Sequence, residues 1–262
     1  MEKYNSIWDM YQKKGMSRRS FIKACTAMAA MLGIAPSMLS EVVEAAEKRL
    51  PVVVWLHGHE CTGCSEAFIR SGAPMASDVV LNMIALEYDD TLAAASGQPF
   101  EEHLQEIIKA YDGQYILAVE GAVPALADSG YCMVGGHAFI NQLKEAAAHC
   151  AAIINYGSCS AWGGIQAARP NPTQSTGVPN IIGDKPIINV PGCPPIPEVM
   201  TGVIAHYAMF GKLPPVDNED VQNSSLAIVC MILAIVVHSL MLVFSLKISM
   251  IKVLKQVGAY IN

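Results

Sequence analysis

Five short apolar runs alternate with amphipathic stretches through the middle of the chain, and this alternation most narrowly limits the possible fold. The runs are rich in β-branched residues and have the length of strands; they lie at 52–57, 79–86, 115–120, 151–156 and 186–190. Between them, residues 100–111 and 138–150 place apolar side chains three or four positions apart, as amphipathic helices do. We therefore predict an α/β, flavodoxin-like doubly wound domain over 51–217, with a mainly parallel sheet covered on both faces.

Cysteines follow three of the predicted strands. The chain has eight cysteines, of which two lie in ECTGC at 60–64, one in GSCSAWGG at 157–164 and one in PGCPP at 191–195. The carboxyl ends of parallel strands meet at one edge of a sheet, where ligands bind. We expect these four site cysteines to lie in loops that meet in one crevice: Cys61, Cys64, Cys159 and Cys193.

Four convergent thiolates suit either Zn²⁺ or an iron–sulfur cluster. A structural zinc site usually draws two short cysteine pairs from one small module, whereas one CxxC here joins two distant single cysteines. That pattern favours a cluster in a domain-scale crevice. Glycines beside the cysteines are expected to let the backbone approach a bulky ligand: Gly63, Gly157, Gly163, Gly164 and Gly192. A thioredoxin-like redox pair is the alternative, which would place Cys64 at a helix start with no further thiols nearby.

The N-terminal segment resembles a twin-arginine export signal over residues 1–46. The sequence SRRSFIK at 17–23 contains the pair Arg18 and Arg19, a modest apolar stretch follows at 24–39, and Ala45 and Ala46 offer a cleavage site. The alternative is a basic helix start before a core helix. The twin-arginine route carries folded proteins, so a metal group inserted before export would keep the cysteines as ligands in an oxidising compartment.

The C-terminal segment has the composition of a membrane helix. Residues 224–246 carry no charge and would form a helix about 34 Å long, enough to cross a bilayer. A basic tail follows at 247–262, so the positive-inside rule predicts a cytoplasmic C-terminus and an external domain. A buried helix is the alternative. The chain has a formal net charge of −6 and no basic stripe, which argues against nucleic acid as a partner.

The three cysteine motifs, together with YCMV at 131–134 and RPNPT at 169–173, resemble the small subunit of membrane-bound, uptake-type nickel–iron hydrogenases. The resemblance covers the export signal and about 51–217. It implies that the four site cysteines bind one proximal [4Fe–4S] cluster. It also implies that a separate large subunit carries the Ni–Fe centre and performs H₂ ⇌ 2H⁺ + 2e⁻, with this chain as the first electron relay.

The resemblance implies further expectations. The protein would work at the periplasmic face of the membrane, with a membrane cytochrome b or another protein as electron acceptor. Glu60, beside the first ligand, would face the large subunit and belong to a proton path or bind that subunit; the alternative is an exposed loop acid. Oxygen-tolerant members have extra cysteines at positions that correspond to Gly63 and Gly164 here, so we expect an oxygen-sensitive enzyme.

The sequence departs from the family pattern after Cys193, where Cys230 is the only further cysteine. The family's usual C-terminal domain with two further clusters has no counterpart here. A shortened natural form, a frame-disrupted product and a subunit that passes electrons directly to another protein all stay open. Two other functions also stay open: a quinone-reductase-type subunit that shares the fold, and a non-catalytic docking remnant. Cys132 and Cys150 are interpreted as buried free thiols, and His57, His59 and His137 as satisfied or exposed side chains.

Overall fold

The computed structural model describes residues 6–13, 15–31, 40, 43–44, 47, 49–72, 74–126 and 129–216. A five-stranded sheet with the order β2-β1-β3-β7-β9 forms its centre, and every neighbouring pair is parallel. The strands are β1 (Val52–His57), β2 (Ala85–Asp89), β3 (Ile116–Glu120), β7 (Ala152–Tyr156) and β9 (Ile187–Val190). This is the 2-1-3-4-5 order of the doubly wound class that includes flavodoxin, so the predicted α/β fold is confirmed.

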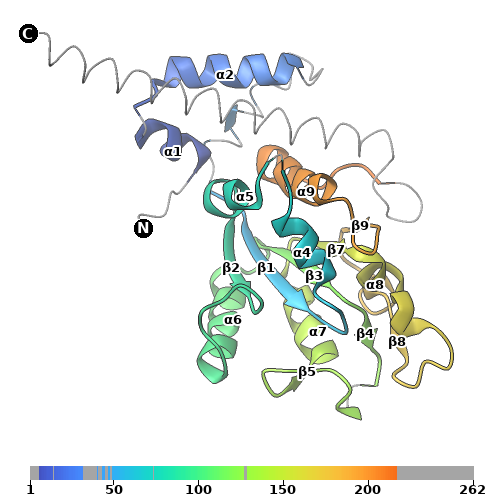
Figure 1. Cartoon of the computed structure of the whole chain (residues 1–262). Helices are drawn as coiled ribbons and strands as arrows, with labels where there is room; N and C mark the ends of the chain where they lie inside the picture. Colours follow the sequence, from blue (N-terminus) through green and yellow to red (C-terminus); the bar gives the residue numbers. More distant parts are fainter. Residues whose placement is uncertain are drawn as a thin grey trace, which may run out of the picture.

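Helices cover both faces of the sheet (Figure 1). One face packs against α4 (Gly63–Ile69), α5 (Ala76–Asn82) and α9 (Pro197–Phe210). The other packs against α6 (Gln98–Ala110) and α7 (Phe139–His149). The predicted helices at 100–111 and 138–150 are thus α6 and α7, each within two residues of its expected bounds.

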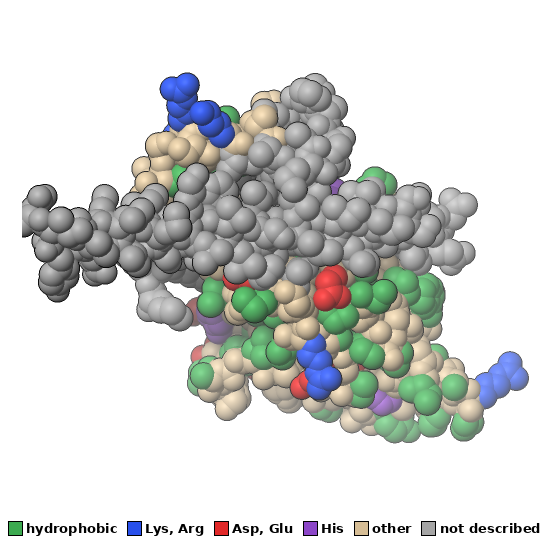
Figure 2. Space-filling view, turned by 45° about the horizontal axis from the view of Figure 1, so that its top comes forward, with side chains coloured by type: hydrophobic (Ala, Val, Ile, Leu, Met, Phe, Trp, Pro, Cys, Tyr) green, Lys and Arg blue, Asp and Glu red, His purple; other side chains and the backbone are tan. Residues whose placement is uncertain are grey.

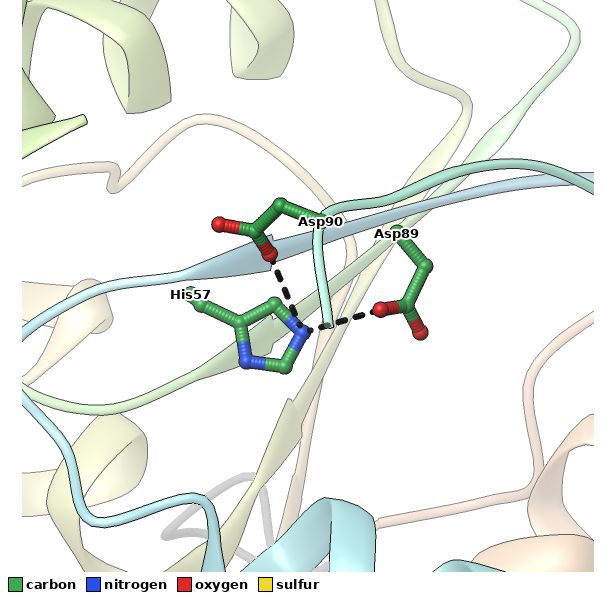
Figure 3. A group of neighbouring side chains, drawn as sticks. All are labelled: His57, Asp89 and Asp90. Carbon is green, nitrogen blue, oxygen red and sulfur yellow. Dashed lines mark ion pairs between the residues drawn. The ribbon is translucent and has the colours of Figure 1, made fainter. Parts of the chain in front are cut away.

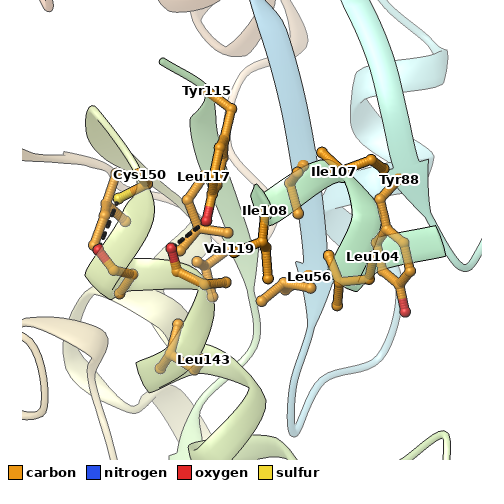
Figure 4. Packing of buried hydrophobic residues seen from close by; sticks show 14 of the residues in the cluster. Leu56, Tyr88, Leu104, Ile107, Ile108, Tyr115, Leu117, Val119, Leu143 and Cys150 are labelled. Atoms are coloured by element: carbon orange, nitrogen blue, oxygen red, sulfur yellow. Dashed lines mark hydrogen bonds between the residues drawn. The ribbon is translucent and has the colours of Figure 1, made fainter. Parts of the chain in front are cut away.

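Strand β1 shows why the central strands are continuously apolar. Val53 and Trp55 face the cluster under α4, α5 and α9, while Val54 and Leu56 face the cluster under α6 and α7. A strand buried on both faces has no side for water, so period-two alternation disappears. Figure 4 shows the second cluster, in which Leu56 from β1 lies near Leu104 and Ile108 from α6, with residues of β3 and α7 beside them.

The second predicted strand, at 79–86, is wrong over most of its length. Residues 76–82 form α5, and β2 begins only at Ala85. Val79 and Met83 are both buried, four positions apart, whereas Leu81 between them is 55% exposed. That is helical spacing, and Asp78 in the first turn suits the positive end of a helix. The run of β-branched residues favours a strand, but the burial period is that of a helix.

Short elements complete the carboxyl edge of the sheet. β4 (Val123–Pro124) pairs antiparallel with β8 (Ser175–Thr176), and β5 (Met133–Val134) pairs with β6 (His137–Ala138) in a hairpin. After β7 the chain forms α8 (Gly157–Trp162) and the 3₁₀ turns η3 (Gly164–Ala167) and η4 (Val178–Asn180). The β4–β8 pair ties the segment after β7 to the segment after β3, which sets the two side by side.

The predicted terminal segments are described only in part. The N-terminal residues contain α1 (Ile7–Lys13) and α2 (Arg18–Met31), and Arg18 forms an ion pair of 2.9 Å with Glu47. The predicted membrane helix at 224–246 and the basic tail at 247–262 lie outside the described residues. Within the described part of the chain, no helix combines the length and apolarity needed to cross a membrane.

Candidate iron–sulfur site

The structure brings the four site cysteines together at the carboxyl edge of the sheet. The charges of Cys61, Cys159 and Cys193 all act on the thiol of Cys64. Cys61 follows β1 and Cys193 follows β9 in loops, as predicted, but Cys64 lies in the first turn of α4 and Cys159 within α8. A helix start at Cys64 also fits a thioredoxin-like pair, but the two additional thiols beside it do not.

Hydrogen bonds lock two of the cysteine segments to each other. The Ser158 N–H donates to the Gly192 carbonyl at 2.8 Å, and the Ser158 hydroxyl lies 3.1 Å from the same oxygen. Because these residues directly precede Cys159 and Cys193, the spacing of the two thiols is fixed by backbone contacts rather than by the thiols themselves.

Two glycines leave room that the thiols occupy. A Cβ on Gly157 would lie 2.5 Å from the Sγ of Cys64, and one on Gly164 would lie 2.6 Å from the Sγ of Cys159. Both glycines also have a positive φ, of 93° and 55°, which side chains disfavour. Any residue with a side chain would therefore displace a site thiol at either position.

The spacing of the thiols fits a group larger than one metal ion. Within the described ranges, only His57, Asp89 and Asp90 form a set of three possible ligand atoms that all lie within 4.8 Å of one another. No three of the site sulfurs are that close. Sulfurs that surround a single zinc ion tetrahedrally are about 3.8 Å apart, given a Zn–S bond near 2.3 Å. The thiols as they stand therefore do not have the geometry of a zinc site.

The electrostatics of the site also suit a positively charged group. Burial raises the pKa of the Cys64 thiol far above its usual range, and the charges of Glu120 and the other site thiols raise it further. Burial likewise raises the pKa of Cys159. Four thiolates gathered at this end of the sheet would therefore repel one another, and iron ions would supply the compensating charge.

Glu120 forms hydrogen bonds to the segment that contains Cys61 and Cys64. It ends β3, is 1% exposed, and accepts the N–H groups of Cys64 and Ser65, each at 2.9 Å. The Ser65 hydroxyl donates to the same carboxylate at 2.6 Å. Thr62, the residue before α4, makes no side-chain cap, so Glu120 satisfies N–H groups that the helix start leaves open. Burial raises the pKa of Glu120.

Glu60 is not the exposed loop acid that one interpretation expected. Its side chain is 13% exposed; one carboxylate oxygen accepts the Thr62 hydroxyl at 3.2 Å, and the other is buried without a hydrogen-bond partner. His57, at the end of β1, is buried beside it. Neither Glu120 nor the charged surroundings of His57 could be found from the sequence, because both residues have the pattern of strand residues.

Two of the other described cysteines, Cys132 and Cys150, were predicted to be buried free thiols. Cys150 is buried and its thiol donates to the Ala147 carbonyl, which confirms that prediction. Cys132 is only half-buried, so that prediction is wrong in degree: it packs at the rim of the core beside the β5–β6 hairpin rather than inside it. All seven described cysteines are free thiols.

Comparison with known proteins defines the class. The family model described as NADH ubiquinone oxidoreductase, 20 Kd subunit, matches residues 61–207, which begin at the first site cysteine and include all four. The chain belongs to this family.

Within that family the chain is similar to hydrogenase small subunits, as its motifs predicted. It is 51% identical over 220 residues to the uptake hydrogenase small subunit of Azotobacter vinelandii, which covers 84% of this chain and 62% of that protein. The uptake hydrogenase small subunit of Cupriavidus necator is 53% identical over 215 residues, or 82% of this chain and 60% of that protein. The chain thus spans about three fifths of the length of these relatives.

A solved structure agrees with the fold. The Ni-Fe-Se hydrogenase from Desulfomicrobium baculatum matches with a TM-score of 0.63 and 32% identity, over 66% of this chain and 70% of that chain.

Proposed function

We propose that this chain is the small, electron-transferring subunit of a nickel–iron hydrogenase, in which the four site cysteines hold one [4Fe–4S] cluster. One observation carries the proposal: four thiols from three separate strand ends converge in a chain about half identical to uptake hydrogenase small subunits. When bound, such a cluster supplies one-electron transfer.

The chain's own residues do the holding and shaping. Cys61, Cys64, Cys159 and Cys193 would bind iron as thiolates. Gly157 and Gly164 keep the crevice open, and Ser158 fixes the spacing of two ligand segments. None of these residues reacts with H₂, so the Ni–Fe centre and the chemistry of H₂ belong to a separate large subunit.

Exposed apolar side chains near the crevice support a partner subunit at this edge. Trp162 and Ile165, shortly after Cys159, are 47% and 83% exposed, and Ile196, shortly after Cys193, is 57% exposed. On the face drawn in Figure 2, which marks no site residue, hydrophobic side chains outnumber charged ones below the grey residues. Apolar surface beside a site is typical of an interface. We assign this edge to the large subunit and place Glu60 at the buried side of that interface.

The location follows from the terminal sequences. The twin-arginine motif at 17–23 supports export over residues 1–46, and the uncharged stretch at 224–246 supports a membrane anchor. We propose that the protein works at the periplasmic face of the membrane and passes electrons to a cytochrome b or another acceptor. Glycine at positions 63 and 164 supports an ordinary four-thiolate cluster and an oxygen-sensitive enzyme.

Co-expression tests the function. The full chain is produced anaerobically together with the large subunit of a nickel–iron hydrogenase, and the purified material is assayed for H₂-dependent reduction of methyl viologen. The expected result is a complex of the two chains that reduces the dye and loses activity in air. A complex without H₂ oxidation would instead support the docking remnant, and sustained turnover in air would overturn the predicted oxygen sensitivity.

A quinone-reductase-type subunit is the second candidate, favoured by the name of the matching family. Its test uses the same preparation with NADH and a quinone in place of H₂ and the dye. Quinone reduction without any H₂ oxidation would favour this candidate over the first.

A further inference from the structure

A second group of charged side chains lies directly behind the cysteine site. His57 ends β1 and is only 6% exposed. Its Nε2 lies 3.4 Å from an oxygen of Asp89 and 3.5 Å from one of Asp90, both at the end of β2 (Figure 3). The Thr91 hydroxyl also lies 3.2 Å from this nitrogen.

The other ring nitrogen of His57 faces the acids of the cysteine site. Nδ1 lies 3.7 Å from a Glu60 oxygen and 3.9 Å from a Glu120 oxygen. Glu60 directly precedes Cys61, and Glu120 accepts the N–H of Cys64. The imidazole thus stands between two acids from β2 and two acids that touch the ligand segment.

The charge state of this group follows from its neighbours. Burial lowers the pKa of His57, but the neighbouring carboxylates of Asp89, Glu60 and Asp90 outweigh it and raise the pKa to about 10. An imidazolium among four buried or half-buried carboxylates is the arrangement that keeps several of them ionised. The Trp55 ring stacks on the His57 ring, with 6.2 Å between the ring centroids, and so gives the imidazole an apolar neighbour.

We propose that His57 is a positioning residue for the electron relay: its cation holds Glu60 and Glu120 against the ligand segment of Cys61 and Cys64, and so adjusts the electrostatic environment of the bound cluster. The inference rests on the proposed function, since that cluster is its object. His57 itself binds no iron and needs no contact with the partner subunit.

The alternative is that His57 only forms a structural ion pair. The two roles differ in how the midpoint potential of the cluster responds when a charge is removed. Loss of a positive charge near a cluster stabilises its oxidised form, so His57→Gln should lower the midpoint potential. Loss of a nearby negative charge acts in the opposite sense, so Asp90→Asn should raise the potential. The rise should be smaller, because the Asp90 side chain is 33% exposed and solvent screens its charge. A structural pair predicts no such opposite signs.

The matched control is the histidine at the opposite edge of the sheet. His149 forms an ion pair of 2.8 Å with Asp112, and both side chains are exposed. His149→Gln removes a histidine from an ion pair of the same kind, but at the amino ends of the strands. The midpoint potential of the cluster in His149→Gln should equal that in the parent protein.

The experiment is an EPR-monitored redox titration of the four proteins, each purified anaerobically as the complex with the large subunit. Lowered potential in His57→Gln, raised potential in Asp90→Asn and no shift in His149→Gln are expected. Equal potentials in parent and His57→Gln would overturn the inference. If His57→Gln fails to retain its cluster, Asp90→Asn decides: a raised potential supports the inference, and an unchanged or lowered one overturns it. Absence of a [4Fe–4S] signal in the parent would instead overturn the proposed function.

Discussion

The two edges of the central sheet carry similar residue types in opposite environments. At the carboxyl edge, His57 is buried among carboxylates and Gly157 abuts the thiol of Cys64. At the amino edge, His149 pairs with Asp112 in solvent, and Gly113 also has a positive φ, but a Cβ added there would meet nothing within 4 Å. The same side chains therefore form a charged, crowded site at one edge and an ordinary turn at the other.

This difference teaches that burial changes what the same histidine and glycine residues do at the carboxyl edge. An exposed ion pair contributes little, because water and salt screen it. Buried charges instead fix one another's position and ionisation. A substitution at the carboxyl edge is therefore best compared with the same substitution at a similar residue elsewhere in the fold.

The largest effect is expected for a ligand. Cys159→Ser should lower the iron content and H₂-dependent dye reduction at least about tenfold, because a hydroxyl would replace a thiolate that we propose as an iron ligand. Cys150→Ser removes a buried thiol that donates to a backbone carbonyl away from the site and should retain the iron. Iron and sulfide analysis of both variants makes the measurement, and equal iron in the two would contradict the assignment of Cys159.

A glycine should give the next largest effect. Gly157→Ala places a methyl group 2.5 Å from the Cys64 sulfur in a backbone of positive φ, whereas Gly113→Ala meets only the backbone strain. That strain costs about 1–3 kcal/mol, and the overlap at Gly157 adds about as much again. Urea unfolding and iron content compare the two variants. Similar losses in both would mean that the thiol does not crowd Gly157.

The pH dependence of stability tests the buried cation. The folded pKa of His57 is about 10, above the ordinary value of 6.5, so its contribution is complete below pH 6.5 and disappears as the pH rises toward 10. The full chain without iron should lose stability over this range, by at most about 1.4 kcal/mol per pH unit. His57→Gln should flatten the slope, and His149→Gln should keep it. Urea unfolding at several pH values provides the measurement. If the free energy of unfolding of His57→Gln changes with pH as in the parent, His57 is not the group that titrates.

The smallest effect is expected where two loops meet. Ser158→Ala removes the hydroxyl that lies 3.1 Å from the Gly192 carbonyl but keeps the N–H bond to the same oxygen. A single hydrogen bond of this kind contributes about 1 kcal/mol. The variant should therefore retain its iron and unfold at slightly lower urea. A loss of iron as large as in Cys159→Ser would show that the hydroxyl does more than join the loops.

Much of the fold could be predicted because period and burial agree. Residues 52–57 form β1 with the expected bounds, since a strand buried on both faces is apolar throughout. Residues 79–82 instead join a helix, because tertiary packing of Val79 and Met83 overrides the strand preference of a β-branched run. Local sequence does not reveal which faces of an element will be covered.

The candidate site, like the fold, could be predicted from the sequence only in part. The convergence of the four cysteines could be predicted because cysteine after a strand is a distinctive pattern at a predictable edge. Glu120 and His57 could not, since each ends an apolar strand and its partners come from other strands. Contacts across the sheet edge depend on strand order and register, which no motif in the sequence contains.

EPR of the reduced protein, combined with iron and sulfide analysis after anaerobic purification, tests the central claim most directly. We predict one [4Fe–4S] signal with about four iron and four sulfide per chain from this site, abolished in Cys159→Ser and retained in Cys150→Ser. A tightly bound zinc ion, or a chain without iron that still binds its large subunit, would contradict the claim.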